Sequence, residues 1–262
     1  MQRPLRLAIL ECDHSLDPDG SLYGGYGGLI RSWLQTHEAF RSSNVECTIW
    51  DVEIAQTYPA PGAFDAVVIT GSRESARICW FQDDSEAYDK ATSVNDPFDW
   101  VRKLEQFMQG IVGDGKTKSV GLCFGHQLIA KALGAPTLNM MHADNVLSVP
   151  QGTVNIGSTE YCSIQGLYAP NKILTVQAHP EFDRMTMQNV IKVMADHGEL
   201  DEQARTDAVA RNVGGTDADL VLNAIAEFLL GFINSMTSII QEFDNDGKNE
   251  VLLEKSPGLK NQ

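Results

Sequence analysis

The chain has 262 residues, of which 43% are hydrophobic, and this is enough to bury one substantial core. Its 35 acidic and 20 basic residues give a formal net charge of −15. Nucleic acids and anionic membrane surfaces would repel such a chain at long range, so we expect no nucleic acid and no membrane among its partners. Small molecules or other proteins are the expected partners.

The start of the chain predicts a strand rather than a signal peptide, because the apolar run from Leu5 to Leu10 is short and is interrupted by Arg6. No apolar run approaches the roughly 20 residues that span a bilayer. The five cysteines are scattered, with neither a C-x-x-C pair nor the spacing of a zinc site. We therefore expect a reducing, cytoplasmic location, no metal and no cofactor.

Short apolar runs alternate with longer segments of helical period, as in βαβ units around a mostly parallel sheet. The predicted strands are Leu5–Glu11, 47–52, 65–70, Lys118–Leu122, 152–156, 161–167 and 172–178. The predicted helices are 28–40, 97–109, the segment after Cys123 that stops at Gly134, and 218–233. The pattern predicts an α/β fold.

Two segments depart from this rhythm. Residues 73–96 join a predicted strand to a predicted helix, with about 24 residues where two to six are usual, so we interpret them as an insertion. Residues 244–262 are polar and contain Pro and Gly, which predicts a disordered tail. One domain at 1–243 is expected.

The most specific motif is G-L-C-F-G-H-Q at 121–127, where a predicted strand meets a predicted helix. Glycines on both sides of Cys123 are typical of a nucleophile elbow, a strained turn with no room for side chains. The following helix N-terminus favours a thiolate, and the N–H of Phe124 is predicted to face an oxyanion. The alternative is a buried cysteine in an ordinary helix-start turn.

A second motif, V-Q-A-H-P-E-F at 176–182, follows a predicted strand directly. His179 can accept the Cys123 proton, and Glu181 can hold the opposite ring nitrogen. Alone, a His-Pro pair is more often a loop feature, but the two motifs together favour a Cys-His-Glu triad. The glycine-rich run at 23–28 lacks the spacing of a phosphate-binding loop, so we interpret it as a permissive loop near the pocket rim.

These two motifs resemble those of the class I glutamine amidotransferases, and above all a single-domain fungal and plant branch that includes γ-glutamyl peptidases. I-L-E-C-D at 9–13, I-T-G-S-R at 69–73 and M-H-A-D-N-V at 141–146 extend the likeness from Leu5 to about Phe232. The resemblance implies a flavodoxin-like open, mostly parallel sheet with helices on both faces and a nucleophile elbow.

The resemblance also implies roles for single residues. Cys123 would form a γ-glutamyl thioester, His179 would act as base and then as acid, and Glu181 would orient His179. The N–H groups of Gly71 and Phe124 would form the oxyanion hole. Three more residues would lie at or near the glutamine pocket: Gln127, His142 and Asp144.

The chain departs from the family after Ala135, where residues 136–139 replace a strand-rich segment that carries a G-W-E-x-G signature in relatives. That segment packs beside the pocket in the family. Its loss is expected to leave the triad chemistry possible while opening or reshaping the glutamine site.

The leading hypothesis is a thiol enzyme that releases ammonia from glutamine for amidation of a small carboxylic-acid metabolite. No ATP-binding motif is visible in the sequence, so a synthetase partner would have to activate the acceptor. The second hypothesis is a γ-glutamyl peptidase that acts on glutathione-like compounds. The third is a non-catalytic binding or regulatory protein with a degraded pocket.

Overall fold

The computed structural model describes residues 3–14, 23–72, 94–95, 98–140, 143–159, 162–196, 200–212 and 218–232. The expected tail at 244–262 lies outside these ranges, as do His142 and all of the expected 73–96 insertion except residues 94–95. The single domain at 1–243 likewise stays a prediction.

Seven strands form one open sheet in the order β2-β1-β3-β4-β9-β8-β7. The parallel strands are β1 (Leu5–Glu11), β2 (Val45–Asp51), β3 (Ala66–Ile69), β4 (Lys118–Leu122) and β9 (Ile173–Val176). The antiparallel strands at one edge are β7 (Val154–Asn155) and β8 (Gly166–Ala169). β5 (Thr137–Met140) and β6 (Ala143–Val146) form a separate antiparallel pair. The sheet confirms the predicted mostly parallel α/β fold.

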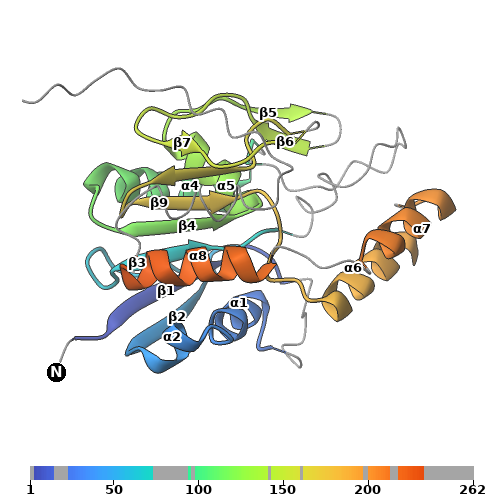
Figure 1. Cartoon of the computed structure of the whole chain (residues 1–262). Coiled ribbons are helices and arrows are strands. Elements are labelled where there is room, and N and C mark those ends of the chain that lie inside the picture. The colour runs from blue at the N-terminus through green and yellow to red at the C-terminus, as the bar shows by residue number, and fades with distance from the viewer. Residues whose placement is uncertain are drawn as a thin grey trace, which may run out of the picture.

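Helices cover both faces of the sheet (Figure 1). One face packs against α1 (Tyr26–Leu34), α2 (Glu38–Ser42) and α8 (Ala218–Leu230), and the other against α4 (Asp99–Asp114) and α5 (Phe124–Ala132). Side chains of β1 alternate between these two cores, since Leu7 and Ile9 face the first and Ala8 and Leu10 the second.

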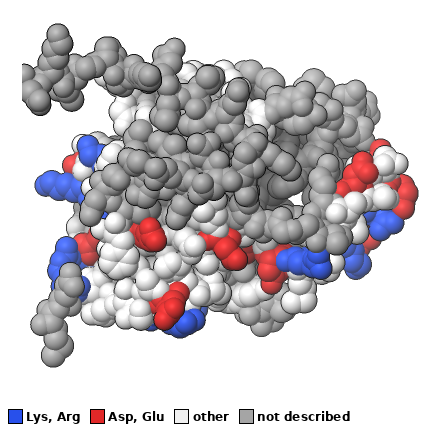
Figure 2. Space-filling view, in the orientation of Figure 1, with Lys and Arg blue, Asp and Glu red and all other residues white. Residues whose placement is uncertain are grey.

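α6 (Arg184–Asp196) and α7 (Glu202–Arg211) lie beyond the end of the sheet (Figure 1). They pack on each other around a small core of their own, formed by Ile191, Met194, Leu200 and Ala208. The face in Figure 2 carries acidic and basic side chains intermixed over this helix pair. Within the described ranges, no helix is long and apolar enough to cross a membrane.

Several predicted elements are wrong in their limits. The helix predicted at 97–109, for example, continues to Asp114. The continuous helix at 28–40 is instead two helices, because α1 ends at Leu34 and His37 caps a new helix by accepting a bond from the Phe40 N–H at 3.4 Å. The strand predicted at 161–167 begins only at Gly166, because Cys162 forms a turn in which its carbonyl accepts from the Thr159 N–H at 2.9 Å. The strands β5 and β6 and the helices α6 and α7 were not predicted.

Candidate active site

Cys123 occupies the sharp turn between β4 and α5. Its φ of 48° is in the left-handed region, which non-glycine residues rarely adopt. The flanking glycines permit this turn, because a Cβ on Gly121 would lie 2.5 Å from the Gly125 carbonyl and one on Gly125 would lie 2.5 Å from the Ile69 oxygen. α5 therefore packs tightly against β3 and β4, as the glycine-flanked motif predicts.

The Cys123 side chain has no exposed surface and lies in a chain of buried amides. The Gln177 side chain donates from Nε2 to Cys123 Sγ at 3.4 Å. Gln127 in turn donates from Nε2 to Gln177 Oε1 at 3.1 Å, which fixes the direction of the Gln177 amide. Both glutamines are 1% exposed, so the Gln177 amide N–H is held in a fixed position against the Cys123 sulfur.

His179 and Glu181 form a buried pair just after β9. His179 Nδ1 lies 2.8 Å from Glu181 Oε1, and since a carboxylate oxygen accepts from a ring N–H, we assign the proton to Nδ1 and the acceptor role to Nε2. The imidazole also stacks on the Phe182 ring, with centroids 4.5 Å apart and planes 7° from parallel. The ring is thus held in both orientation and tautomer.

The strand order brings Cys123 and this pair to the same edge of the sheet. Leu122, the last residue of β4, pairs with Val176, the last residue of β9, and the Cys123 N–H donates to the Val176 carbonyl at 2.9 Å. The Tyr26 hydroxyl contacts both His179 and Glu181. Burial raises the pKa of Tyr26, and Cys123 lies near enough to raise it further. The three residues predicted as a triad therefore share one site.

Gly71 lies against the imidazole, just beyond the end of β3. A Cβ on Gly71 would lie 2.4 Å from His179 Cε1 and 2.9 Å from the Tyr26 hydroxyl, so only glycine fits at this position. Phe124 is the first residue of α5, where backbone N–H groups have no partner within the helix. Of the two predicted oxyanion-hole residues, Gly71 thus borders the His179 imidazole and Phe124 borders the turn at Cys123.

A second histidine near Cys123 has a different environment. His126 is fully buried, and burial lowers its pKa to about 4. Its Nδ1 lies 2.7 Å from the Thr175 hydroxyl. His126 is therefore neutral near pH 7 and supports the packing of α5 on β9.

The remaining predicted pocket residues are not brought to this site by the described contacts. His142 lies outside the described residues. The backbone of Asp144 pairs with Asn139 in the β5–β6 hairpin, which is separate from the main sheet. Among the described residues, no three His, Cys, Asp or Glu side chains are arranged to hold a metal ion.

Sequence reasoning missed Tyr26 and Gln177 as site residues. Both are inside segments that stand out, the glycine-rich run at 23–28 and the motif at 176–182. The run at 23–28 is more than a permissive rim, since the Tyr26 hydroxyl donates to Glu181 Oε1 at 2.6 Å.

No protein-family profile matches the chain. A protein of Schizosaccharomyces pombe named as glutamine amidotransferase-like is 30% identical over 261 residues, which covers 86% of this chain and 98% of that protein. γ-Glutamyl peptidase 5 of Arabidopsis thaliana is 24% identical over 138 residues, covering 38% of this chain and 55% of that protein.

Solved structures share the fold. The crystal structure of a glutamine amidotransferase from Thermotoga maritima has a TM-score of 0.57 at 15% identity, covering 89% of this chain and all of that one. A glutamine amidotransferase from Methylobacillus flagellatus has a TM-score of 0.53 at 15% identity, covering 92% of this chain and 96% of that one. These structures share the fold. The nearly full-length match to the S. pombe relative shows that the chain belongs to the glutamine amidotransferase-like family.

Proposed function

We propose that the protein is a thiol enzyme that attacks the γ-amide of glutamine and releases ammonia for amidation of a small carboxylic acid. The observation that carries this proposal is the buried, hydrogen-bonded pair of His179 and Glu181 beside a cysteine in a strained turn. An acceptor-activating synthetase is the partner that this function requires, because ammonia alone does not amidate a carboxylate at a useful rate.

The proposed reaction begins when His179 Nε2 takes the Cys123 proton. Among the described atoms, Nε2 is buried and has no hydrogen-bond partner, so it is available for this transfer. Sγ then bonds to the amide carbon, the C–N bond breaks, and His179 returns the proton to the leaving ammonia. Water, deprotonated by His179, then adds to the thioester carbon, the C–S bond breaks to give glutamate, and His179 returns this proton to Cys123 Sγ. Because Cys123 has no exposed surface, the substrate reaches Sγ only when neighbouring atoms move.

The negative oxygen formed at each addition step needs preset donors. We assign this role to the N–H groups of Gly71 and Phe124, since Gly71 lies against the His179 imidazole and Phe124 directly follows Cys123. One such donor contributes about 3–4 kcal/mol to stabilising the transition state.

Gln177 is proposed to stabilise the thiolate, because its amide N–H donates to Sγ. Gln127, predicted as a substrate contact, would then act chiefly by orienting Gln177. Replacing Gln177 with leucine is expected to slow both glutamine hydrolysis and iodoacetamide alkylation of Cys123 at pH 7 by about tenfold, the loss expected for a hydrogen bond to an ionised group.

The matched control is Gln165→Leu, which removes a more exposed glutamine amide whose side-chain partner is the Thr159 hydroxyl. Peptide-level mass spectrometry after timed alkylation measures the Cys123 rate in both variants. An unchanged Cys123 rate in Gln177→Leu would remove Gln177 from the mechanism.

A second candidate function uses the same residues as a γ-glutamyl peptidase. The Arabidopsis relatives named as γ-glutamyl peptidases favour it, at 24% and 22% identity. In that reaction the thioester forms in the same way, but the leaving group is the amine of a peptide and water is the final acceptor.

One substrate panel separates these functions. The protein and its Cys123→Ser variant are incubated with glutamine, glutathione and a γ-glutamyl anilide, and ammonia, glutamate and aniline are quantified. Ammonia from glutamine that depends on Cys123 supports the first function, and faster cleavage of glutathione supports the second. Turnover of none of the three would favour a non-catalytic binding protein.

A further inference from the structure

Tyr26 is the first residue of α1, and its hydroxyl reaches the pair formed by His179 and Glu181. It donates to Glu181 Oε1 at 2.6 Å and lies 3.2 Å from His179 Nδ1, in a position where the tyrosine is 1% exposed. We propose that Tyr26 is a positioning residue that holds the Glu181 carboxylate, and through it the His179 imidazole, in the geometry that activates Cys123. This inference rests on the proposed function of the same site.

Tyr26 can position Glu181 because it shares one carboxylate oxygen, Oε1, with His179. Glu181 Oε1 accepts from both His179 and Tyr26, whereas Glu181 Oε2 is buried and has no hydrogen-bond partner among the described residues. The carboxylate orientation therefore depends on Oε1 alone. Without the tyrosine hydroxyl, the imidazole would be the one remaining described partner holding the carboxylate, and each would be freer to rotate.

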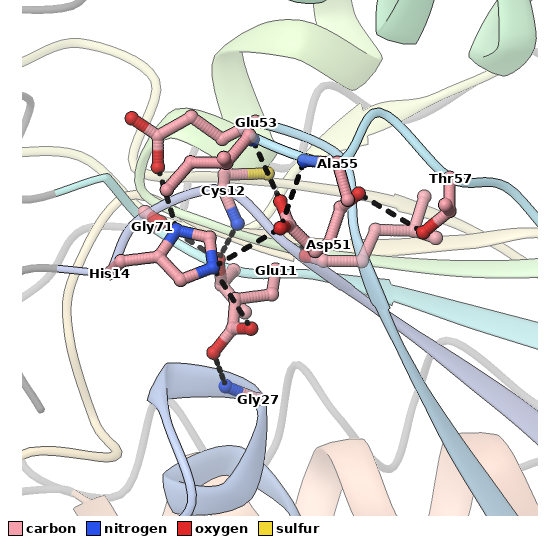
Figure 3. A network of polar contacts seen from close by, with 12 residues as sticks. Glu11, Cys12, His14, Gly27, Asp51, Glu53, Ala55, Thr57 and Gly71 are labelled. Atoms are coloured by element: carbon pink, nitrogen blue, oxygen red, sulfur yellow. Dashed lines mark hydrogen bonds and ion pairs between the residues drawn. The ribbon is translucent and has the colours of Figure 1, made fainter. Parts of the chain in front are cut away.

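Glu11, the last residue of β1, holds the first turn of α1, which carries Tyr26. Glu11 Oε1 accepts from the Gly27 N–H at 2.8 Å (Figure 3). Burial raises the pKa of this carboxyl, and the backbone N–H groups of Gly27 and Tyr26 act against that rise. A negative charge at a helix N-terminus is favourable because the backbone N–H groups there have no helical partners. The approach is close, since a Cβ on Gly25 would lie 2.5 Å from Glu11 Oε1.

Glu11 is itself part of a wider polar network at the ends of β1 and β2 (Figure 3). His14 Nε2 lies 3.6 Å from carboxylate oxygens of both Glu11 and Asp51, and His14 Nδ1 lies 3.0 Å from Glu53 Oε2. These contacts hold the Glu11 carboxylate, which in turn holds the N-terminus of α1. The position of Tyr26 thus follows from the glycine-rich run together with the end of β1.

Tyr26 acts as a hydrogen-bond donor over the whole working pH range. Burial raises its pKa, and the charges of Glu181, Cys123 and Asp13, which face it, raise the pKa further. A tyrosine that stays protonated can donate to a carboxylate but cannot serve as a second base. Its role is therefore positioning rather than proton transfer.

The test variant is Tyr26→Phe, which keeps the ring and removes the hydroxyl. Its matched control is Tyr168→Phe on β8, because Tyr168 is also 1% exposed and its buried hydroxyl has no partner among the described residues. Both substitutions delete one buried hydroxyl from the same hydrophobic core. They differ in whether that hydroxyl touches the proposed triad.

Two readouts are compared at pH 7. Tyr26→Phe is expected to lower kcat for glutamine about tenfold while KM stays within about twofold, and to slow iodoacetamide alkylation of Cys123 by a similar factor. Cys12 is buried directly after β1 and lies outside the proposed triad, so its alkylation should stay at the wild-type rate. Tyr168→Phe should change neither readout for Cys123.

Equal Cys123 alkylation in the two variants would overturn the proposal. So would a faster Cys12 reaction together with a lower melting temperature in Tyr26→Phe, because that result reports a loosened fold. If the wild-type protein turns over no γ-glutamyl substrate, the proposed function fails, yet the alkylation comparison still decides whether Tyr26 positions the pair that activates Cys123.

Discussion

Replacing Cys123 with serine is expected to lower kcat/KM for glutamine hydrolysis by at least about 10⁴-fold, as loss of a nucleophile does in comparable triads. Serine fills nearly the same volume and keeps the turn at position 123. The substitution therefore affects the reactivity of this side chain rather than its packing. A hydroxyl is far less acidic than a thiol, so it forms the attacking anion much less readily in a site built around a cysteine. Ammonia release in a coupled assay measures the effect.

The control is Cys47→Ser. Cys47 lies in β2, which is separated from β4 by two strands, and it is half-buried. Its replacement should leave the rate within about twofold of wild type. Residual hydrolysis above 1% in Cys123→Ser would mean that another group attacks the amide.

Replacing Gly71 with alanine is expected to lower kcat on the order of 10²-fold. The added methyl group would lie 2.4 Å from His179 Cε1 and 2.9 Å from the Tyr26 hydroxyl, so the imidazole must shift. A displacement of about 1 Å in a reacting group is enough for a loss of this size. Steady-state kinetics with glutamine measure it, with circular dichroism melting to follow stability.

The matched substitution is Gly110→Ala in α4, where a Cβ would meet no atom within 4 Å. It should leave kcat unchanged and stabilise the helix by roughly 0.5–1 kcal/mol. If both glycine variants retained wild-type kcat, the crowding of Gly71 against His179 would have no bearing on catalysis.

The turn at Cys123 could be predicted because its causes are local. At Gly121 and Gly125 a side chain would strike the backbone of this turn or of β3, and the two glycines flank the cysteine in the sequence. The limits of β1 and β4 were likewise predicted correctly, since β1 ends at the charged Glu11 and β4 begins at the charged Lys118 and ends where the cysteine motif turns.

Tyr26 could not be predicted because its partners are distant in the sequence. His179 and Glu181 lie 153 and 155 positions away, and only the packing of α1 against the carboxyl ends of the strands brings them together. Gln177 similarly meets Cys123 across 54 positions. Pattern reasoning finds such contacts only when a family resemblance already assigns them.

The helices α6 and α7 escaped prediction for a different reason. Their buried residues, such as Ile191 and Ala208, pack on each other and not on the sheet. The prediction rested on alternation between strands and sheet-covering helices, and a helix pair beyond the sheet falls outside that pattern. The break at His37 was missed because Leu34 and Phe40 are both buried, so the apolar spacing continues across it.

The central claim is that Cys123 forms a covalent bond to the γ-carbonyl carbon of a glutamine-like substrate. It is tested most directly by incubating the protein with a diazo-ketone analogue of glutamine and mapping the adduct by peptide mass spectrometry. The account predicts one adduct, on Cys123, that excess glutamine suppresses and that is absent from Cys123→Ser. An adduct on another residue, or glutamine hydrolysis without any adduct on Cys123, would contradict it.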